Sequence, residues 1–188
     1  MPELPEVETV RDGLDRHVLG ARVVDVEVLR DYSVRRHDGG PADFRDQLLG
    51  QRLDAAVRRG KFLWLPLAQA GSTNGPDDGP AAALLAHLGM SGQLLVRSGP
   101  GLGERSPHLR VRLVLEPDGA GPAGALALDF VDQRTFGHLS VADLLATPDG
   151  APGGLGSPRP QVPEPVAHIA RDLLDPALDR ARHRPSSA

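Results

Sequence analysis

A series of short apolar segments, separated by loops rich in glycine, proline and aspartate, limits the possible folds more than any other feature. Residues 21–30, ARVVDVEVLR, alternate apolar and polar side chains as a half-buried strand does. Similar segments follow at residues 52–57, 61–65, 82–88, 93–97, 108–116 and 125–131, with Arg59-Gly60 as a tight turn and loops at 71–80, 98–107 and 117–124. This spacing predicts a mainly β, α+β fold built on an antiparallel β-sandwich or barrel, with flanking helices.

Helices are expected at both ends of this series. Apolar residues recur at three- and four-residue steps through residues 5–19, and Gly20 is placed to end the helix that they predict. The stripe consists of Val7, Val10, Leu14 and Val18. Its burial would hold the N-terminus at a fixed place. A short helix is also predicted at residues 141–146.

The last quarter of the chain has a different composition. Residues 147–165 are dense in proline and glycine, which is typical of a linker. Residues 166–182 are compatible with a final helix broken at Pro176, and residues 183–188 with a disordered tail. We therefore expect a β-sandwich domain at residues 1–146, a linker at 147–165 and the start of a further helical segment at 166–188.

Composition excludes several kinds of chemistry. The 188 residues include no cysteine, which excludes disulfides, thiolate catalysis and cysteine-ligated zinc. No stretch approaches the roughly 18 apolar residues of a membrane span, and the N-terminus lacks a basic-then-apolar signal pattern. The expected protein is cytoplasmic, monomeric and free of a membrane anchor.

Charge is distributed unevenly. The formal net charge of -4 argues against a nucleic-acid binder, whereas residues 30–61 carry eight basic and five acidic side chains, a local excess of three. Of the 21 basic residues, 20 are arginine and only Lys61 is lysine. Lysine offers a titratable amine and a compact charge for phosphate that arginine does not. The competing explanation is that the single lysine is present by chance and has no special role.

The N-terminus combines a nucleophile with an acid. If Met1 is removed, Pro2 becomes a free secondary amine beside the carboxylate of Glu3. An α-amino group titrates at about 7.7–8.0, so part of it is unprotonated and nucleophilic at neutral pH. Its attack on a carbonyl or aminal carbon yields an iminium ion, and Glu3 can move the accompanying proton. Ordinary helix-start chemistry explains the same residues, because proline and carboxylates are favoured in a first helical turn.

Two segments resemble the formamidopyrimidine-DNA glycosylase family, bacterial enzymes that excise oxidised purines. The string MPELPEVETV resembles the family's N-terminus, and Leu4 favours this branch over the endonuclease VIII relatives, which tend to carry glycine there. Residues 58–63, RRGKFL, resemble the segment around the family's catalytic lysine. The resemblance implies that Pro2, Glu3 and Lys61 are catalytic, with Lys61 serving the elimination steps.

Two further motifs match loops of the same family. Residues 87–92 read HLGMSG, and residues 132–137, DQRTFG, resemble a D-x-R-x-F-G loop. By resemblance Met90, Arg134 and Phe136 fill the gap that an everted nucleotide leaves in the duplex, and we expect Arg134 and Phe136 on one side of an extended strand. Apolar wedges with an arginine suit that task, since flipping a base costs a few kcal/mol of unstacking.

The resemblance adds other candidates and one departure. His108 matches a family histidine that contacts DNA phosphate, Arg134 also binds DNA, and Glu6 and His87 are secondary candidates, with His87 read mainly as structural. The similarity covers roughly residues 1–175. The family's helix-two-turn-helix module and four-cysteine zinc finger have no counterpart here, so truncation or a frameshift is plausible. No metal or other cofactor is expected in this chain.

The implied function is base-excision repair of damaged double-stranded DNA. The enzyme would be a bifunctional glycosylase that removes formamidopyrimidine and 8-oxoguanine and cleaves the strand by β,δ-elimination through a Pro2 imine. Two alternatives remain at this point. The chain is an inactive DNA-binding remnant with weak, weakly salt-dependent binding, or it is a tautomerase with an N-terminal proline, although in tautomerases that proline opens a strand.

Overall fold

The computed structural model describes residues 4–69, 80–117 and 124–169. The helices are α1 (Leu4–His17) and α2 (Gly40–Leu48), with short 3-10 turns η1 (Asp31–Val34), η2 (Gly99–Gly103) and η4 (Glu164–Val166). The strands are β1 (Arg22–Val28), β2 (Gln51–Leu53), β3 (Val57–Arg59), β4 (Phe62–Gln69), β5 (Ala82–His87), β6 (Gly92–Ser98), β7 (Leu109–Glu116), β8 (Leu126–Asp132), β9 (His138–Ala146) and β10 (Gln161–Pro163). The predicted antiparallel, mainly β fold is confirmed.

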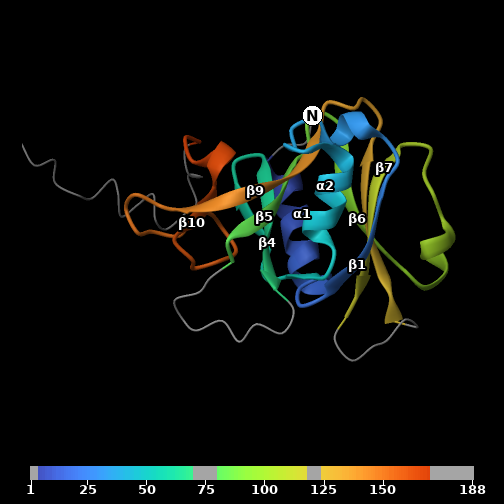
Figure 1. The fold of residues 1–188 in the computed structure, drawn as a ribbon, viewed down its shortest axis with the longest axis horizontal. Coiled ribbons are helices and arrows are strands. Elements are labelled where there is room, and N and C mark those ends of the chain that lie inside the picture. The colour runs from blue at the N-terminus through green and yellow to red at the C-terminus, as the bar shows by residue number, and fades with distance from the viewer. Residues whose placement is uncertain (1–3, 70–79, 118–123, 170–188) are drawn as a thin grey trace, which may run out of the picture.

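The strands form one antiparallel sheet that folds over into two layers. Within the described residues the order is β10-β9-β5-β4-β2-β1-β7-β8-β6, and β3 pairs with β4. Figure 1 shows β4, β5 and β9 on one side of the helices and β1, β6 and β7 on the other. The main core lies between the layers and includes Leu63, Leu84 and Leu139 from the first and Val111, Leu113 and Leu128 from the second. Each helix packs on both layers, α1 against β3 and β6 and α2 against β1 and β9.

Helix α1 forms where the apolar stripe predicts it. Val7, Leu14 and Val18 are fully buried in the main core, while Val10 is half-buried beside them. Gly20 has a φ of 82°, a left-handed conformation that glycine adopts without steric cost, and the chain turns there into β1. The helix therefore lies against the sheet through its whole length.

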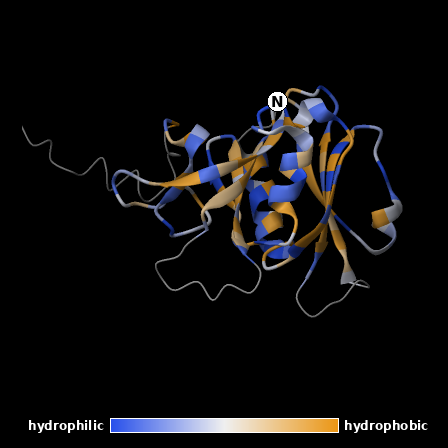
Figure 2. Ribbon diagram, in the orientation of Figure 1, coloured by the Kyte–Doolittle hydropathy of each residue, from blue (hydrophilic) through white to orange (hydrophobic). Residues whose placement is uncertain are grey.

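Strands β4 and β5 are buried on both faces, which explains their nearly continuous apolar sequences FLWLPLA and AALLA. On β4, Leu63 and Leu65 face the main core, and Trp64 faces a second core with Leu85 and Val162. Figure 2 shows hydrophobic residues along the strands of both layers and mostly hydrophilic residues in the loops between them. These two strands form a rigid base for the loops at their ends.

The prediction of a short helix at residues 141–146 is wrong, because this segment belongs to strand β9. Val141 pairs with Leu84 of β5, and Leu144 pairs with Pro163 of β10. Alanine and leucine favour helix locally, but six residues are too few for a stable isolated helix. The segment forms a strand because it pairs with β5 and β10 and because its alternate side chains are buried in the two cores.

The single strand predicted at residues 52–57 is interrupted. β2 ends at Leu53 and β3 begins at Val57, with irregular backbone between them. The N–H of Asp54 donates to the carbonyl of Pro66 at 2.9 Å. Pro66 has no N–H with which to return a bond, so the ladder breaks opposite it.

Residues 147–169, expected to begin as a linker, pack against the first layer. The backbone groups of Arg58 and Leu155 exchange two hydrogen bonds of 2.9 Å, and Val162 and Val166 are buried in the second core. Gly153 and Gly154 allow this approach, since an added Cβ would lie 1.7 Å from the Gln161 carbonyl oxygen and 2.4 Å from that of Arg58. The division into domains stays a prediction, and most of the helix predicted at 166–182 and the whole tail lie outside the described residues.

No helix in the described part of the chain has the length and apolar composition needed to cross a membrane.

Candidate functional site

The two motif loops, residues 87–92 and 132–137, lie against each other at one end of the sheet. The Ser91 hydroxyl donates to Asp132 Oδ1 at 2.7 Å and accepts from the backbone N–H of Arg134 at 3.1 Å. The other Asp132 oxygen accepts from the Gly137 N–H at 2.8 Å. Asp132 is fully buried, so one carboxylate joins both loops.

Glycine is required where the loops meet. Gly89 has a φ of 62°, and a Cβ there would lie 2.6 Å from the backbone nitrogen of Gly137. A Cβ on Gly92 would lie 2.3 Å from the Leu88 carbonyl oxygen, to which the Gly92 N–H donates a 2.7 Å hydrogen bond. A side chain at Gly89 would push the two loops apart, and one at Gly92 would clash within the 87–92 loop itself.

The joined loops expose the three residues predicted to enter the duplex. Met90 is 41% and Phe136 is 57% exposed, and Arg134 is exposed between them in sequence. Large apolar side chains in the open beside a cation are suited to contact nucleobases. The structure thus brings Met90 near the segment that carries Arg134 and Phe136, although the roles of these residues stay predictions.

The extended strand expected for Arg134 and Phe136 is wrong. β8 ends at Asp132 and β9 begins at His138; residues 133–135 form bends, and residues 136–137 have no regular structure. Thr135 has a φ of 59°, which is unusual for a β-branched residue. The loop that contains Thr135 is held by the hydrogen bonds that Ser91 and Gly137 donate to Asp132 and by those that Arg35 donates to the carbonyls of Phe136 and Gly137. Strand periodicity does not reveal such tertiary contacts.

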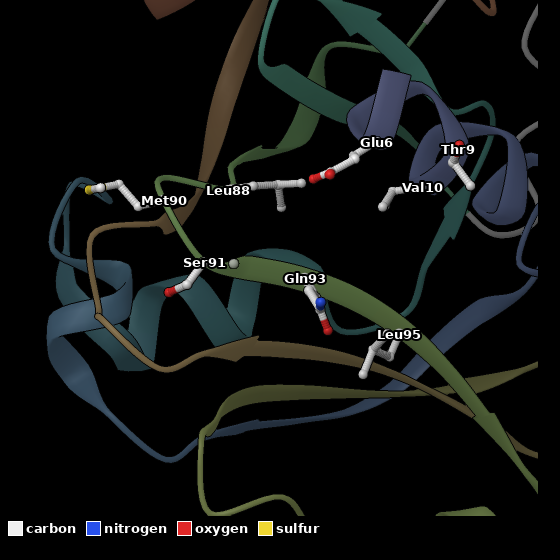
Figure 3. Close-up of a pocket in the computed structure, with 9 residues that line it drawn as sticks. Glu6, Thr9, Val10, Leu88, Met90, Ser91, Gln93 and Leu95 are labelled. Carbon is white, nitrogen blue, oxygen red and sulfur yellow. The ribbon is translucent and has the colours of Figure 1, made fainter. Parts of the chain in front are cut away.

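A pocket of about 540 Å³ lies between the start of α1 and strand β6. Figure 3 shows α1 with Glu6 and Val10 on one side of the pocket and strand β6 with Gln93 and Leu95 on the other, with Met90 at one end. The volume falls within the usual range of roughly 300–1,000 Å³ for small-molecule sites. Among the described residues that line this pocket, the carboxylate is that of Glu6, a secondary candidate from the sequence.

Lys61 lies half-buried in the turn between β3 and β4, where its charge acts on His87. Burial, and after it the charge of Lys61, lowers the pKa of His87. The rings of His87 and His138 stack with centroids 5.5 Å apart, and Phe62 meets His87 edge-on at 4.8 Å. His87 Nδ1 accepts from the Gly89 N–H at 3.0 Å, so the neutral ring keeps its proton on Nε2.

His138 is the more strongly perturbed histidine. Burial first, and then the charges of His87, Arg35 and Arg36, lower the pKa of His138 to about 4. Its Nδ1 is buried without a hydrogen-bond partner among the described residues. Both rings are therefore neutral near pH 7, and the positive charges that act on them come from Lys61, Arg35 and Arg36.

His108 precedes β7 and contacts the start of the 132–137 loop. Its carbonyl accepts from the Asp132 N–H at 3.0 Å, and its N–H donates to Ser106 Oγ at 3.1 Å. The neighbouring Arg110 Nε donates to the Asp132 carbonyl at 2.9 Å. The structure thus places His108, half-exposed, next to the start of the 132–137 loop.

Pro2 and Glu3 lie outside the described residues, and they precede the first residue of α1 in the chain. Helix α1 itself is tied to β3. Glu8 accepts hydrogen bonds from Arg58 Nε at 2.7 Å and from Arg11 Nε at 2.8 Å. Arg11 also donates to the carbonyl of Ala56 at 3.2 Å.

Sequence reasoning missed the residues that hold the loops. Asp132 and Ser91 were part of the quoted motifs but had no role, and Arg35 counted only as charge. An acid at the end of the apolar strand LALDFVD was an available signal, because a buried carboxylate requires partners. No group of three or more histidine, aspartate or glutamate side chains in the described residues is arranged to hold a metal ion.

Residues 1–139 match the family model for the formamidopyrimidine-DNA glycosylase N-terminal domain. The chain belongs to the formamidopyrimidine-DNA glycosylase family. All nine site residues proposed from the sequence, and both loops, lie within the matched range.

Curated relatives named formamidopyrimidine-DNA glycosylase agree over most of the chain. The relative from Mycobacterium ulcerans is 49% identical over 179 residues, 95% of this chain and 54% of its own length. Those from Leifsonia xyli and Thermobifida fusca are 48% and 51% identical, and the alignments cover 56% and 53% of their lengths. The chain spans about half the length of these formamidopyrimidine-DNA glycosylases.

Solved structures of the family share the fold. Fpg from Lactococcus lactis, in complex with DNA that contains an abasic site, has a TM-score of 0.59 at 25% identity, covering 75% of this chain and 44% of that one. The same protein with DNA containing N7-benzyl-Fapy-dG has a TM-score of 0.60 at 25% identity, covering 76% and 44%. A MutM structure with DNA containing carbocyclic 8-oxo-G has a TM-score of 0.59 at 25% identity, covering 76% and 45%.

Proposed function

We propose that this chain carries the catalytic domain of a DNA glycosylase that excises oxidised purines and then cleaves the abasic strand. Membership of the formamidopyrimidine-DNA glycosylase family supports the reaction class. The observation that carries the proposal is the pair of loops joined through Asp132, which presents Met90 at the edge of the pocket at the start of α1 and leaves Phe136 exposed.

The exposed loops would act first on the duplex. Met90 and Phe136 are suited to enter the stack that the damaged nucleotide vacates, and Arg134 to meet the unpaired base opposite. The pocket lined by Glu6, Thr9 and Gln93 offers polar groups and space for the everted base. His108 and Lys61 are the candidates for phosphate contacts.

The proposed chemistry starts from the Pro2 amine. Its nitrogen attacks C1′ of the damaged nucleotide, the bond from C1′ to the base breaks, and Glu3 protonates the sugar-ring oxygen as the ring opens. The resulting iminium acidifies the C2′ protons. Loss of such a proton expels one phosphate by β-elimination, and δ-elimination then releases the second, with Lys61 assisting the proton transfers.

This sequence contains no cysteine, and the proposed steps involve only residues that it does contain. A tautomerase is less well supported, because α1 begins at Leu4, directly after Pro2 and Glu3, where a tautomerase would have a strand.

Borohydride trapping tests the proposal. Incubation of the protein with a duplex containing an abasic site, followed by reduction, should yield a covalent adduct that peptide mass spectrometry maps to Pro2. Such an adduct also requires removal of Met1, because only a free amine forms the iminium.

The matched control inserts one glycine between Met1 and Pro2. This insertion places the proline nitrogen in a peptide bond and should abolish the adduct at Pro2 without changing any described residue. Absence of an adduct with the unmodified sequence, in a protein shown to be folded, would contradict the proposed lyase activity and favour the inactive-remnant alternative.

A further inference from the structure

Phe136 is held in the open by a constrained backbone. It is 57% exposed, and the preceding Thr135 has a φ of 59°. A β-branched residue keeps such a conformation only when its surroundings impose it. The position of the Phe136 ring therefore depends on the groups that hold the 132–137 loop from both sides.

Arg35 holds the same loop through two backbone carbonyls. Its Nη2 donates to the carbonyl of Phe136 at 3.0 Å, and its Nη1 donates to the carbonyl of Gly137 at 3.1 Å. Two donors from one planar guanidinium bind two successive carbonyls, so the orientation of the peptide after Phe136 is set by Arg35.

Tyr32 in turn holds the guanidinium. Arg35 Cζ lies 4.2 Å from the centroid of the Tyr32 ring, and Arg35 Nη1 also donates to the Tyr32 carbonyl at 2.9 Å. The ring is 57% exposed, and the cation on its face gives it a defined partner. The side chain of Arg35 is thus fixed by a ring and by three carbonyls.

The segment that carries both residues is itself anchored. His37 is buried, and its Nδ1 accepts from the Val141 N–H of β9 at 3.0 Å. Its Nε2 donates to Asp43 of α2 at 2.7 Å, and its ring meets Phe44 edge-on at 5.4 Å. Tyr32 and Arg35 therefore project from a platform fixed to the first layer of the sheet.

We propose that Arg35, seated on Tyr32, is a positioning residue that presents Phe136 for insertion into duplex DNA. The inference rests on the proposed function, because it takes Phe136 as an inserting residue. Arg35 acts through the backbone of Phe136 and Gly137, and its own donors are directed to those carbonyls.

Insertion can be measured without chemistry. A duplex carries a stable abasic analogue next to 2-aminopurine, whose fluorescence changes when its stacking partner is displaced. Arg35→Lys keeps the charge but lacks the planar fork, so it should weaken insertion by about 10-fold, the loss expected for charged donors to two carbonyls. Arg105→Lys is the matched control, since Arg105 pairs with Glu27 on the surface and should leave insertion unchanged.

A second pair of variants tests the ring. Tyr32→Leu removes the aromatic face beneath Arg35 and should reduce insertion. Tyr32→Phe keeps that face and should retain most of the insertion seen with the unmodified protein. Unfolding curves of each variant show that the folded state persists. Equal losses with leucine and phenylalanine would contradict a role for the stacked ring.

Combination with Phe136→Ala separates positioning from direct DNA contact. If Arg35 acts through Phe136, Arg35→Lys should cause little further loss of duplex affinity in the Phe136→Ala background. A full additional 10-fold loss there would overturn the proposal, because Arg35 would then bind DNA itself.

Single-stranded DNA distinguishes failure of this inference from failure of the proposed function. Borohydride trapping on an abasic single strand needs no insertion, so Arg35→Lys should leave it unchanged. If Pro2 is trapped and the Arg35→Lys variant inserts as well as the unmodified protein, the inference alone is overturned, whereas no trapping would contradict the proposed function. The fluorescence assay tests the role of Arg35 whether or not Pro2 is trapped. If the unmodified protein at saturation caused no change in fluorescence, the inference would also be overturned.

Discussion

Asp132 is the residue on which the geometry of both motif loops depends. Each of its carboxylate oxygens accepts one hydrogen bond, from Ser91 at 2.7 Å and from the Gly137 N–H at 2.8 Å. Since Asp132 is fully buried, water cannot replace either donor. The exposure of Phe136 and the strained Thr135 are consequences of these two bonds and of the two that Arg35 makes.

Asp132→Asn should destabilise the protein and loosen both loops. An amide keeps one acceptor oxygen and turns its NH₂ group toward a donor, so one buried N–H or O–H loses its partner. The free energy of unfolding, measured by urea denaturation, should fall by about 1–3 kcal/mol. Ser91→Ala removes one bond without introducing a donor and should cost about 1 kcal/mol. Unchanged stability and unchanged hydrogen exchange at the Gly137 amide in Asp132→Asn would contradict this account.

At the scale of elements, helix α1 is fixed to the sheet by charge as well as by its apolar stripe. Arg58 is buried on β3 and donates to Glu8 at 2.7 Å, and Arg11 donates to the same carboxylate. Burial acts to raise the pKa of Glu8, but the hydrogen bonds from Arg58 and Arg11 outweigh it and lower that pKa below its ordinary value. Because Pro2 and Glu3 directly precede α1, this anchor limits where the proposed nucleophile can reach.

Glu8→Gln should therefore destabilise the helix–sheet contact. We expect a loss of about 1–3 kcal/mol at pH 7, less than for a fully buried pair because Glu8 is partly exposed. A lowered carboxyl pKa stabilises the fold above the unfolded pKa, and that stability is lost as the pH falls through the folded pKa. Urea denaturation at pH 7 and pH 3 should show the difference between the two proteins shrinking in acid.

The matched control for Glu8→Gln is a surface ion pair of the same helix. Asp12 accepts from Arg16 at 3.0 Å, with both side chains exposed. Asp12→Asn should change stability by less than about 0.5 kcal/mol. Equal effects of the two substitutions would mean that Glu8 does not anchor α1.

At the scale of the whole molecule, the stacked histidines make global stability depend on pH. His87 and His138 face each other from β5 and β9, and burial lowers the pKa of His138 to about 4. The unfolded chain binds a proton at His138 below a pH of about 6.5, while the folded chain resists until about 4. Stability should thus fall as the pH drops through this window.

His138→Phe removes this titration and keeps an aromatic ring against His87. The slope of unfolding free energy against pH between about 4 and 6.5 should become shallower than in the unmodified protein. His17→Gln, at an exposed position of α1, should leave the slope unchanged. A slope unaffected by His138→Phe would show that this ring is not the source of acid sensitivity.

Secondary structure could be predicted from the sequence where the periodicity of apolar residues matches the face that the fold buries. Helix α1 and strands β1 and β7 follow the periodicity of their own residues, because one face of each must be buried whatever its neighbours are. Prediction failed where pairing decides. Residues 141–146 form a strand because β5 and β10 flank them, and the strand at 52–57 breaks because Pro66 lies opposite.

The sequence by itself determined the mainly β fold, the burial of α1 and the family, since each depends on residues close together in the chain. Only the tertiary structure decided how the 87–92 and 132–137 loops meet and that Arg35 and Tyr32 support Phe136. The hydrogen bonds from Ser91 to Asp132 and from Arg35 to Phe136 join residues 41 and 101 positions apart. Hydrogen bonds over such separations leave no periodic trace in the sequence, because they depend on the register of the sheet that brings the groups together.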